Sequence, residues 1–353
     1  MLLIITQTIN NGYISQQLIF IGRHTFKTMK KINVMNRLLC IGGLLLLGSI
    51  AVNADSWIKS YNIIEWCARD YHAAIVLSGG EIVIMGGYSN NGAQNDVWIS
   101  DDKGKFWYQQ TNNAGWNKRY AHNAVALPDD EIVVMGGWTS NGIQNDVWIS
   151  VDNGHSWTQL DNAAWSKRSG HAAVVLSTGE IVVMGGYDGS RRNDVWISDD
   201  KGKSWTQQTN DAWSSGRMNH AAVVLSDDEI VVMGGNTGNR ENDVWISNNK
   251  GKSWTQLNNA EWSAREFHAV VTLSDGEIVV MGGYDGSRRN DVWISNDKGK
   301  YWTQLNNAEW SAREFHAAVA LPDDKIVVMG GFTNDVIPLN DVWMYNGKII
   351  RGK

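Results

Sequence analysis

The sequence predicts an all-β fold, a six-bladed β-propeller closed by its own N-terminal strand. Three observations support this prediction. One repeat occurs six times, each copy contains an apolar run ending in Gly-Gly, and the strand missing after the last copy is present before the first. Repetition at a fixed period indicates a repeat architecture. The Gly-Gly pairs are spaced 48 to 50 residues apart, at residues 86–87, 136–137, 185–186, 234–235, 282–283 and 330–331.

Each repeat contains four short β-rich segments separated by turns. In order, it reads Arg-x-x-His, an apolar stretch that ends in Leu, a turn such as Ser-Asp-Gly-Glu and the run Ile-Val-Val-Met-Gly-Gly. A polar loop, Asn-Asp-Val-Trp-Ile-Ser, a second turn and Trp-Thr-Gln follow. Gly, Asp and Asn in the turns favour antiparallel hairpins. No segment has a helical period long enough to compete. We therefore expect one four-stranded antiparallel sheet per repeat.

The second segment of each repeat is apolar without alternation, which indicates a strand that is covered on both faces. A sheet that is buried on both faces and repeated six times is expected to lie between two sheets of the same kind. An open stack would need atypical repeats to cap its ends. The sequence contains no such repeat, so a closed ring is favoured.

The two ends of the repeat region indicate how the ring closes. The last repeat stops near Tyr345 without a fourth segment, whereas Ser56-Trp57 and residues 65–69 supply that segment before the first repeat. An N-terminal strand that completes the last sheet would pair edges that are otherwise exposed. We therefore assign residues 55–353 to the propeller and expect Trp57 to pair with the segment around Val342.

Residues 1–54 have a different composition. They carry five basic residues, no acidic residue and no repeat. Lys30, Lys31 and Arg37 precede an apolar run, residues 38–52, and small residues follow it, which is typical of a secretory signal peptide. The run is shorter than the ~20 residues that span a bilayer, so a membrane anchor is disfavoured. We expect translation to start at Met29 or Met35, and the protein to be exported, either periplasmic or extracellular, with no membrane contact after cleavage.

Charge and cysteine content exclude several classes of partner. Removing the five basic residues changes the formal net charge from −6 to −11, which argues against nucleic acid as a partner. Cys40 lies in the predicted signal peptide, so the mature chain can form no intrachain disulfide. We expect Cys67 to be a small residue at a strand end, with a reactive thiol as the alternative. We also expect a monomer without a cofactor or a bound metal.

The Gly-Gly pairs, the downstream Asp-Val-Trp and the following Trp and Arg resemble kelch repeats throughout residues 55–353. The resemblance implies that the connection carrying Arg-x-x-His faces the mouth of a central channel. A second pattern, Ser-x-Asp-x-Gly-x-x-Trp, is similar to the Asp-box of sialidases. It begins at Ser100, Ser150, Ser198 and Ser295, and the copy from Ser247 has Asn249 in place of Asp. We interpret this pattern as a hairpin that assists folding.

The resemblance places two recurring sets of side chains at the channel mouth. The arginines are Arg69, Arg119, Arg168, Arg217, Arg265 and Arg313. The aromatic residues that follow Gly-Gly are Tyr88, Trp138, Tyr187, Tyr284 and Phe332. Both kinds of side chain suit sugars and carboxylates. The alternative is that the recurring Arg and His bond to neighbouring backbone and to the Asp of Asp-Val-Trp, which we favour for His.

The loops after Gly-Gly differ in charge between repeats. Those of the third to fifth repeats carry Arg191, Arg192, Arg240, Arg288 and Arg289, whereas those of the first two repeats carry no charge. A basic rim on an acidic protein favours an anionic ligand, either a glycan such as a sialic-acid-like sugar or an acidic protein segment. Arg191, Arg240 and Arg288 therefore join the candidate ligand-binding residues.

A sialic-acid-active enzyme, either an epimerase or mutarotase or a sialidase-like hydrolase, is the alternative function. Asp70, Glu266 and Glu314 replace Tyr120, Ser169 and Met218 at one repeat position and would supply acid–base groups near the channel. However, an active site needs neighbours with separated pKa values, and these repeats are close copies of one another. We therefore favour a ligand-binding or protein-interaction module, assign no catalytic residue, and keep a purely structural surface protein as a third possibility.

Overall fold

The structure is a computed structural model that describes residues 2–10, 13–21, 56–62 and 64–347. Its chain divides into two units, Met1–Ile50 and Ala51–Lys353. The first contains an antiparallel hairpin of β1 (Leu2–Asn10) and β2 (Tyr13–Ile21). The basic and apolar segments of the predicted signal peptide, and its cleavage site, lie outside the described residues. No helix capable of crossing a membrane occurs in the described part of the chain.

The second unit is all-β and repeats one antiparallel sheet of four strands, as predicted. In the first repeat, the chain passes outward through β5 (Ala73–Val76), β6 (Ile82–Met85), β9 (Val97–Ser100) and β10 (Tyr108–Thr111). The second repeat contains β12 (Asn123–Ala126), β13 (Ile132–Met135), β16 (Val147–Ser150) and β17 (Thr158–Gln159). The third contains β18 (Ala172–Val175), β19 (Ile181–Met184), β20 (Val195–Ser198) and β21 (Thr206–Thr209).

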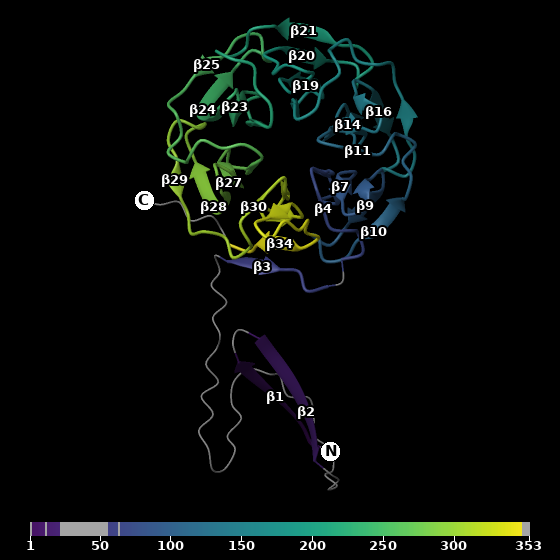
Figure 1. Cartoon of the computed structure of the whole chain (residues 1–353), viewed down its shortest axis with the longest axis vertical. Helices are drawn as coiled ribbons and strands as arrows, with labels where there is room; N and C mark the ends of the chain where they lie inside the picture. The colour runs from purple at the N-terminus through teal and green to yellow at the C-terminus, as the bar shows by residue number, and fades with distance from the viewer. Residues whose placement is uncertain (1, 11–12, 22–55, 63, 348–353) are drawn as a thin grey trace. The chain divides into compact units, whose positions relative to one another are not determined.

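The remaining repeats keep the same order of strands. The fourth contains β22 (Ala221–Val224), β23 (Ile230–Asn236), β24 (Arg240–Ser247) and β25 (Thr255–Gln256). The fifth contains β26 (Ala269–Thr272), β27 (Ile278–Tyr284), β28 (Arg288–Ser295) and β29 (Thr303–Gln304). The last contains β31 (Ala317–Ala320), β32 (Ile326–Met329), β34 (Val342–Tyr345) and β3 (Trp57–Lys59). The innermost strands follow one another around a ring, in which β31 again lies beside β5 (Figure 1).

The N-terminal strand closes the last sheet, as predicted. β3 pairs with β34 in antiparallel register, with Trp57 opposite Tyr345. The N–H of Ser60 donates to the carbonyl of Val342 at 2.8 Å. The Trp57 ring packs against Tyr345 and edge-on against Trp310, with centroids 5.3 and 5.9 Å away. Residues from the two ends of the propeller therefore share one sheet and one apolar contact.

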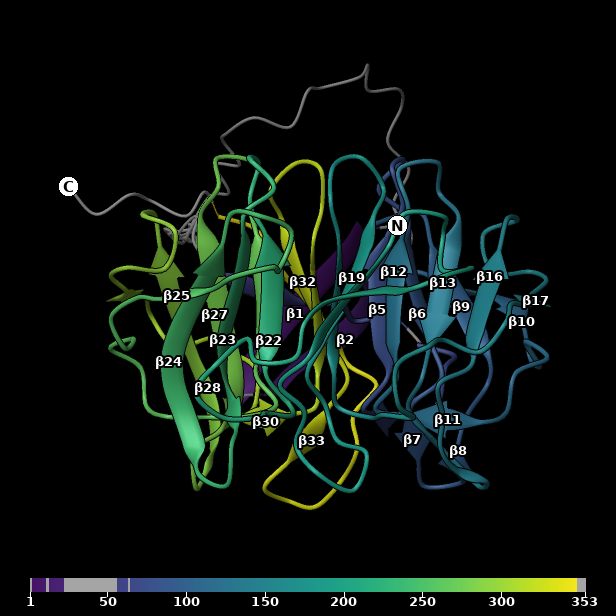
Figure 2. The ribbon, with the colours of Figure 1, turned by 90° about the horizontal axis from the view of Figure 1, so that it is seen from above.

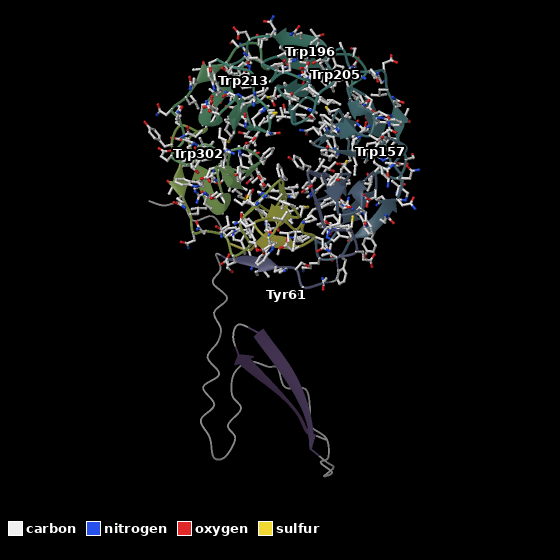
Figure 3. The ribbon with its side chains drawn as sticks, viewed as in Figure 1. Tyr61, Trp157, Trp196, Trp205, Trp213 and Trp302 are labelled. Carbon is white, nitrogen blue, oxygen red and sulfur yellow. The ribbon has the colours of Figure 1, made fainter. Side chains whose placement is uncertain are left out.

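The second strands form the core, and each is covered on both faces. In β13, the side chains from Ile132 to Met135 are fully buried. Val83 and Met85 of the preceding sheet pack against Ile132 and Val134. Tryptophans fill the outer part of each interface: Trp262 packs edge-on against Trp302 at 6.0 Å, and Figure 3 labels other members of this set within the ring of sheets. The continuous apolar runs thus correspond to strands between two neighbouring sheets, as the sequence indicates.

The Ser-x-Asp-x-Gly-x-x-Trp segments form tight turns on the way to the outermost strand. In the first repeat, the N–H of Gly104 donates to Ser100 Oγ at 2.9 Å, and the N–H of Phe106 donates to Asp102 Oδ1 at 2.9 Å. Trp107 Nε1 donates to the carbonyl of Gly104 at 3.2 Å. Gly104 has φ of 83°, a left-handed conformation that glycine adopts at little cost. These bonds agree with the interpretation of the pattern as a folding device.

Short strands form a layer at one end of the ring (Figure 2), and its last set is continuous with the sheet of the fifth repeat through β28. The first set is β4 (Arg69–Asp70), β7 (Tyr88–Ser89) and β8 (Gly92–Ala93). The second is β11 (Arg119–Tyr120), β14 (Trp138–Thr139) and β15 (Gly142–Ile143). The third is β30 (Arg313–Glu314) with β33 (Phe332–Thr333). This layer joins the Arg-x-x-His connections to the loops after Gly-Gly, and it positions the candidate site.

Candidate binding site at the channel mouth

The six repeat arginines have a structural role, and the expectation that they bind a ligand is wrong. Each is fully buried. Arg119 donates from Nη1 and Nη2 to the two carboxylate oxygens of Asp146, at 2.9 and 2.6 Å, and from Nη1 to the carbonyl of Gly136. Its guanidinium also lies over the Trp116 ring. The same pairing with the Asp of Asp-Val-Trp recurs for Arg69, Arg168, Arg217, Arg265 and Arg313. A guanidinium held in this way has no free face for a ligand.

The repeat histidines do not make the hydrogen bonds that the sequence predicts, because neither ring nitrogen of any of the six has a hydrogen-bond partner among the described residues. They are buried, and burial together with the neighbouring arginine lowers their pKa, for His72, His171 and His268 to about 3. They are therefore neutral at pH 7. Among the residues that the structure describes, no three His, Cys, Asp or Glu side chains are close enough together to hold a metal ion. Cys67 lies two residues before β4 rather than at a strand end, and it accepts a hydrogen bond from Arg69, as Ser263 does from Arg265 in the fifth repeat.

A cavity of about 150 Å³ lies at the centre of the ring, bounded by the six Arg-x-x-His connections, and we call it the mouth. The residue two positions after each arginine lines it, namely Tyr71, Ala121, Gly170, Asn219, Phe267 and Phe315. These residues have φ between 51° and 60°, which turns the backbone of each connection in the same way. Their N–H groups each donate to the carbonyl of the equivalent residue in the preceding repeat, at 2.8 to 3.3 Å. The mouth is thus bounded by a closed ring of backbone hydrogen bonds.

The side chains around this ring are not symmetric. Tyr71 stacks on Phe315 with ring centroids 3.8 Å apart, and Phe267 packs on Phe315 at 4.0 Å. The opposite half of the ring carries only Ala121, Gly170 and Asn219. One side of the mouth is therefore an aromatic cluster, whereas the other side is open and bounded by small residues.

Three carboxylates lie one position before the aromatic cluster: Asp70, Glu266 and Glu314. They are only 8, 5 and 5% exposed. Glu266 is paired with Arg240 at 3.3 Å, and Glu314 with Arg288 at 2.6 Å. Each of these arginines comes from the preceding repeat. The sequence predicted acid groups near the channel, and the three carboxylates directly precede residues that line the mouth without lining it themselves.

The two paired arginines also contact the aromatic residues that follow Gly-Gly. The guanidinium of Arg240 lies 4.4 Å from the centroid of the Tyr284 ring, and that of Arg288 lies 4.9 Å from the Phe332 ring. The predicted grouping of these arginines and aromatic rings is therefore present. Their charge, however, is already balanced by Glu266 and Glu314, so neither arginine makes the rim positive.

Asp70 differs from the two glutamates because no cation of the described residues pairs with it. Its Oδ1 is buried and has no hydrogen-bond partner in the described part of the chain. Burial, and then the nearby charge of Glu314, raise the pKa of Asp70 to about 6. Tyr88, in the same short sheet, is 47% exposed, and Trp138 in the next repeat is 39% exposed. The first two repeats thus present the most exposed aromatic faces of the mouth beside an unbalanced carboxylate.

The comparison with known protein families agrees with this architecture. A family model described as the KLHDC2/KLHL20/DRC7 Kelch-repeats domain matches residues 50–212 and, in a second match, residues 206–349. The chain belongs to the kelch-repeat family. None of the curated proteins matches it significantly in sequence. Kelch repeats suggest a protein-interaction module, and the fold of this chain is a kelch β-propeller built from four-stranded sheets.

The other rim arginines of this kelch propeller divide into two groups. Arg192 and Arg289 are paired with Asp188 and Asp285 of their own loops. Arg191 is exposed and donates from Nε to Asn236 Oδ1 at 3.1 Å. Tyr187, on the same loop, is half-buried. None of the predicted rim arginines is among the residues that line the mouth, and most of them are neutralised by ion pairs.

Sequence reasoning missed the residues that give the mouth its asymmetric shape, Tyr71, Phe267 and Phe315. They occupy the second variable position of Arg-x-x-His, which also contains Ala121, Gly170 and Asn219. The signal was a position that varies widely in size between the constant arginine and the constant histidine of the repeat. It is this position, rather than the constant arginine, that faces the mouth.

Proposed function

We propose that this kelch propeller is an exported interaction module that binds a segment of a partner protein at the mouth. The observation that carries the proposal is the asymmetry of the mouth. The exposed ring of Tyr88 comes from the strand position opposite Asp70, the exposed ring of Trp138 comes from the next repeat, and Oδ1 of Asp70 is buried without a hydrogen-bond partner among the described residues. Aromatic faces combined with a few polar groups are typical of binding surfaces. The rest of the ring repeats the same structural contacts and offers no comparable feature.

Three finer statements belong to this proposal. The propeller has six blades, which the six Gly-Gly repeats and the ring of inner strands support. The Ser-x-Asp-x-Gly-x-x-Trp hairpins are Asp-boxes that assist folding, which their hydrogen bonds support. The protein is exported and acts as a monomer outside the cytoplasm, which the basic and apolar pattern of the N-terminal segment supports for export.

Selection of peptides from a random library displayed on phage, against the full chain, tests the binding function. We expect selected peptides to lose at least tenfold in affinity for the Trp138→Ala variant. Tyr301→Ser is the matched control, because Tyr301 is a 64% exposed aromatic residue on an outer turn. The proposal is contradicted if no peptide is selected, or if the two variants weaken binding equally.

An anionic glycan or an acidic segment is the second candidate ligand, and Arg191 is the observation that favours it. This arginine is exposed on the same loop as Tyr187, and it donates a hydrogen bond to the side-chain amide of Asn236 rather than to a carboxylate. A glycan array would then give a sialylated ligand whose signal falls in Arg191→Ala and stays in Arg192→Ala, since Arg192 is already paired with Asp188. Turnover of sialic acids by the same protein, lost in Asp70→Asn, would instead indicate the enzyme alternative, because the Asp70 pKa of about 6 suits acid–base catalysis.

A further inference from the structure

The fifth and sixth repeats each contain a slot that holds a guanidinium. One wall is the carboxylate of Glu266 or Glu314, and the other is the ring of Tyr284 or Phe332. The occupant comes from the preceding repeat, Arg240 in the first case and Arg288 in the second. The chain therefore contains two examples in which a carboxylate and an aromatic ring together bind a guanidinium.

The first repeat has the same two walls, but no guanidinium of the described residues lies between them; the Tyr88 ring instead contacts Tyr120 edge-on, with centroids 5.3 Å apart. Asp70 corresponds to Glu266 and Glu314, and Tyr88 corresponds to Tyr284 and Phe332. The position equivalent to Arg288 is Pro338, because Pro338 bridges to Phe332 as Arg288 pairs with Tyr284. Proline has neither charge nor a side-chain donor.

The missing occupant explains two features of the first repeat. Asp70 is more than nine-tenths buried, yet its Oδ1 has no hydrogen-bond partner among the described residues. The Tyr88 ring is 47% exposed, whereas Tyr284 and Phe332, which lie under an arginine, are partly buried. A buried carboxylate oxygen without a partner is costly, so Oδ1 of Asp70 points to a group that arrives from outside.

We propose that Asp70 and Tyr88 bind a basic side chain of the partner, an arginine in preference to a lysine. The inference rests on the proposed function, and it gives the partner segment its chemistry. A guanidinium would donate to the carboxylate and stack on the ring, two interactions that strengthen each other in a partly buried site. Arginine is preferred because a planar guanidinium suits both walls, and because both occupied slots contain one.

A small probe tests this slot without knowledge of the partner. N-acetyl-argininamide carries the guanidinium with neutral ends, and N-acetyl-citrullinamide has nearly the same shape without the charge. We expect the first to shift the Tyr88 ring resonances of the full chain saturably in an NMR titration, and the second to bind at least tenfold more weakly. Asp70→Asn should remove the difference between the probes. Asp335→Asn, which removes an exposed carboxylate on the neighbouring loop, is the control and should keep it.

A second variant reconstructs the pattern of the other repeats. Pro338→Arg would supply an internal guanidinium, and we expect it to block the arginine probe. If this variant fails to fold, the comparison of wild type with Asp70→Asn still decides. Equal binding of the two probes to the wild type, or undiminished binding of the arginine probe to Asp70→Asn, would overturn the inference. Selected peptides that bind at Trp138 without a basic residue would overturn it while leaving the proposed function intact.

Discussion

The second glycine of each Gly-Gly pair lies against the histidine of its own repeat: a Cβ on Gly137 would lie 2.5 Å from Cβ of His122 and 2.7 Å from its Cα. The first glycine meets the histidine of the next repeat, since a Cβ on Gly136 would lie 3.0 Å from Cε1 of His171. Gly-Gly is thus the place where two histidine-bearing connections approach the second strand, and a side chain there has no space.

We therefore predict that Gly137→Ala lowers the free energy of unfolding by about 3 kcal/mol or more, through steric overlap added to a left-handed backbone. Gly142→Ala is the matched control. Gly142 has φ of 88°, close to the 90° of Gly137, but no atom lies within 4 Å of its Cβ position. Urea denaturation of both variants measures the difference. Equal losses would mean that backbone strain alone, and not the contact with His122, fixes the glycine.

The buried pair of Arg119 and Asp146 predicts a large loss when one partner is removed. Arg119→Ala leaves a buried carboxylate without its counter-ion, so we expect a loss of about 3–5 kcal/mol in unfolding free energy. Lys118→Ala, which removes the exposed neighbouring cation, should change it by less than about 0.5 kcal/mol. Chemical denaturation provides the comparison, and a loss in Arg119→Ala as small as in the control would show that the pair is not structural.

Six neutral histidines predict destabilisation by acid. The folded pKa of about 3 for His72, His171 and His268 lies below the unfolded value of 6.5, so the unfolded chain binds more protons within that interval. Stability is therefore complete above pH 6.5 and is lost as the pH falls toward 3. With up to six histidines taking part, the free energy of unfolding falls by up to about 8 kcal/mol per pH unit.

Urea denaturation at a series of pH values measures this effect as the number of protons taken up on unfolding. We expect several protons per molecule between pH 5 and 6, and acid unfolding within about one or two pH units of 6.5. An uptake near zero in this range would be incompatible with buried neutral histidines.

Pairing of Trp57 with Tyr345 predicts the result of an N-terminal truncation. A chain that begins after Ser60 lacks β3 and exposes the edge of β34. We expect lower stability and concentration-dependent association through this edge, because unpaired strand edges recruit other strands. Unfolding curves and light scattering provide the measurements. A chain that begins at Asp55 is the control and should remain stable, and a truncated chain that matches it in both measurements would contradict closure by β3.

The fold was predictable from the sequence because the strands that pair in each sheet come from consecutive segments of one repeat. The missing fourth segment near Tyr345 and the surplus segment at Trp57 could be matched by counting, and the pairing follows. The arginines misled for a related reason. A residue that recurs in every repeat makes a contact that every repeat requires. For Arg69, this contact is the ion pair with Asp96 of the same repeat. Recurrence therefore marks packing rather than ligand binding.

The mouth was less predictable because its shape depends on backbone conformation. Tyr71 faces the centre of the ring since its φ of 51° turns the connection there, and no local pattern indicates which of the two variable positions does so. The pairing of Arg288 with Glu314 is a contact between repeats whose geometry the spacing of charges does not give. Because the sequence does not reveal this pairing, the rim arginines were predicted to be unpaired positive charges.

The carboxyl of Asp70 provides the last prediction, a substitution that stabilises the protein. Its pKa of about 6 in the folded chain exceeds the ordinary value of 3.8, so the folded state holds a proton that the unfolded state has released between these values. Stability contributed by the neutral form is therefore present below pH 3.8 and is lost as the pH rises through 6. Asp70→Asn keeps the shape and removes the charge. We expect it to raise the unfolding free energy at pH 7.5 by up to about 3 kcal/mol, and to have little effect near pH 4.

Urea denaturation of wild type and Asp70→Asn at both pH values measures this change, and the acid effect of the histidines cancels in the difference. Asp335→Asn, at an exposed position, should have no effect at either pH. A buried charge that destabilises the free protein is retained where ligand binding requires it. If Asp70→Asn is more stable than the wild type and no longer discriminates between the arginine and citrulline probes, the same carboxylate both destabilises the free protein and binds the ligand. Equal stability of wild type and Asp70→Asn at pH 7.5 would instead mean that the carboxylate is well solvated in the free protein, and the argument from its burial would fail.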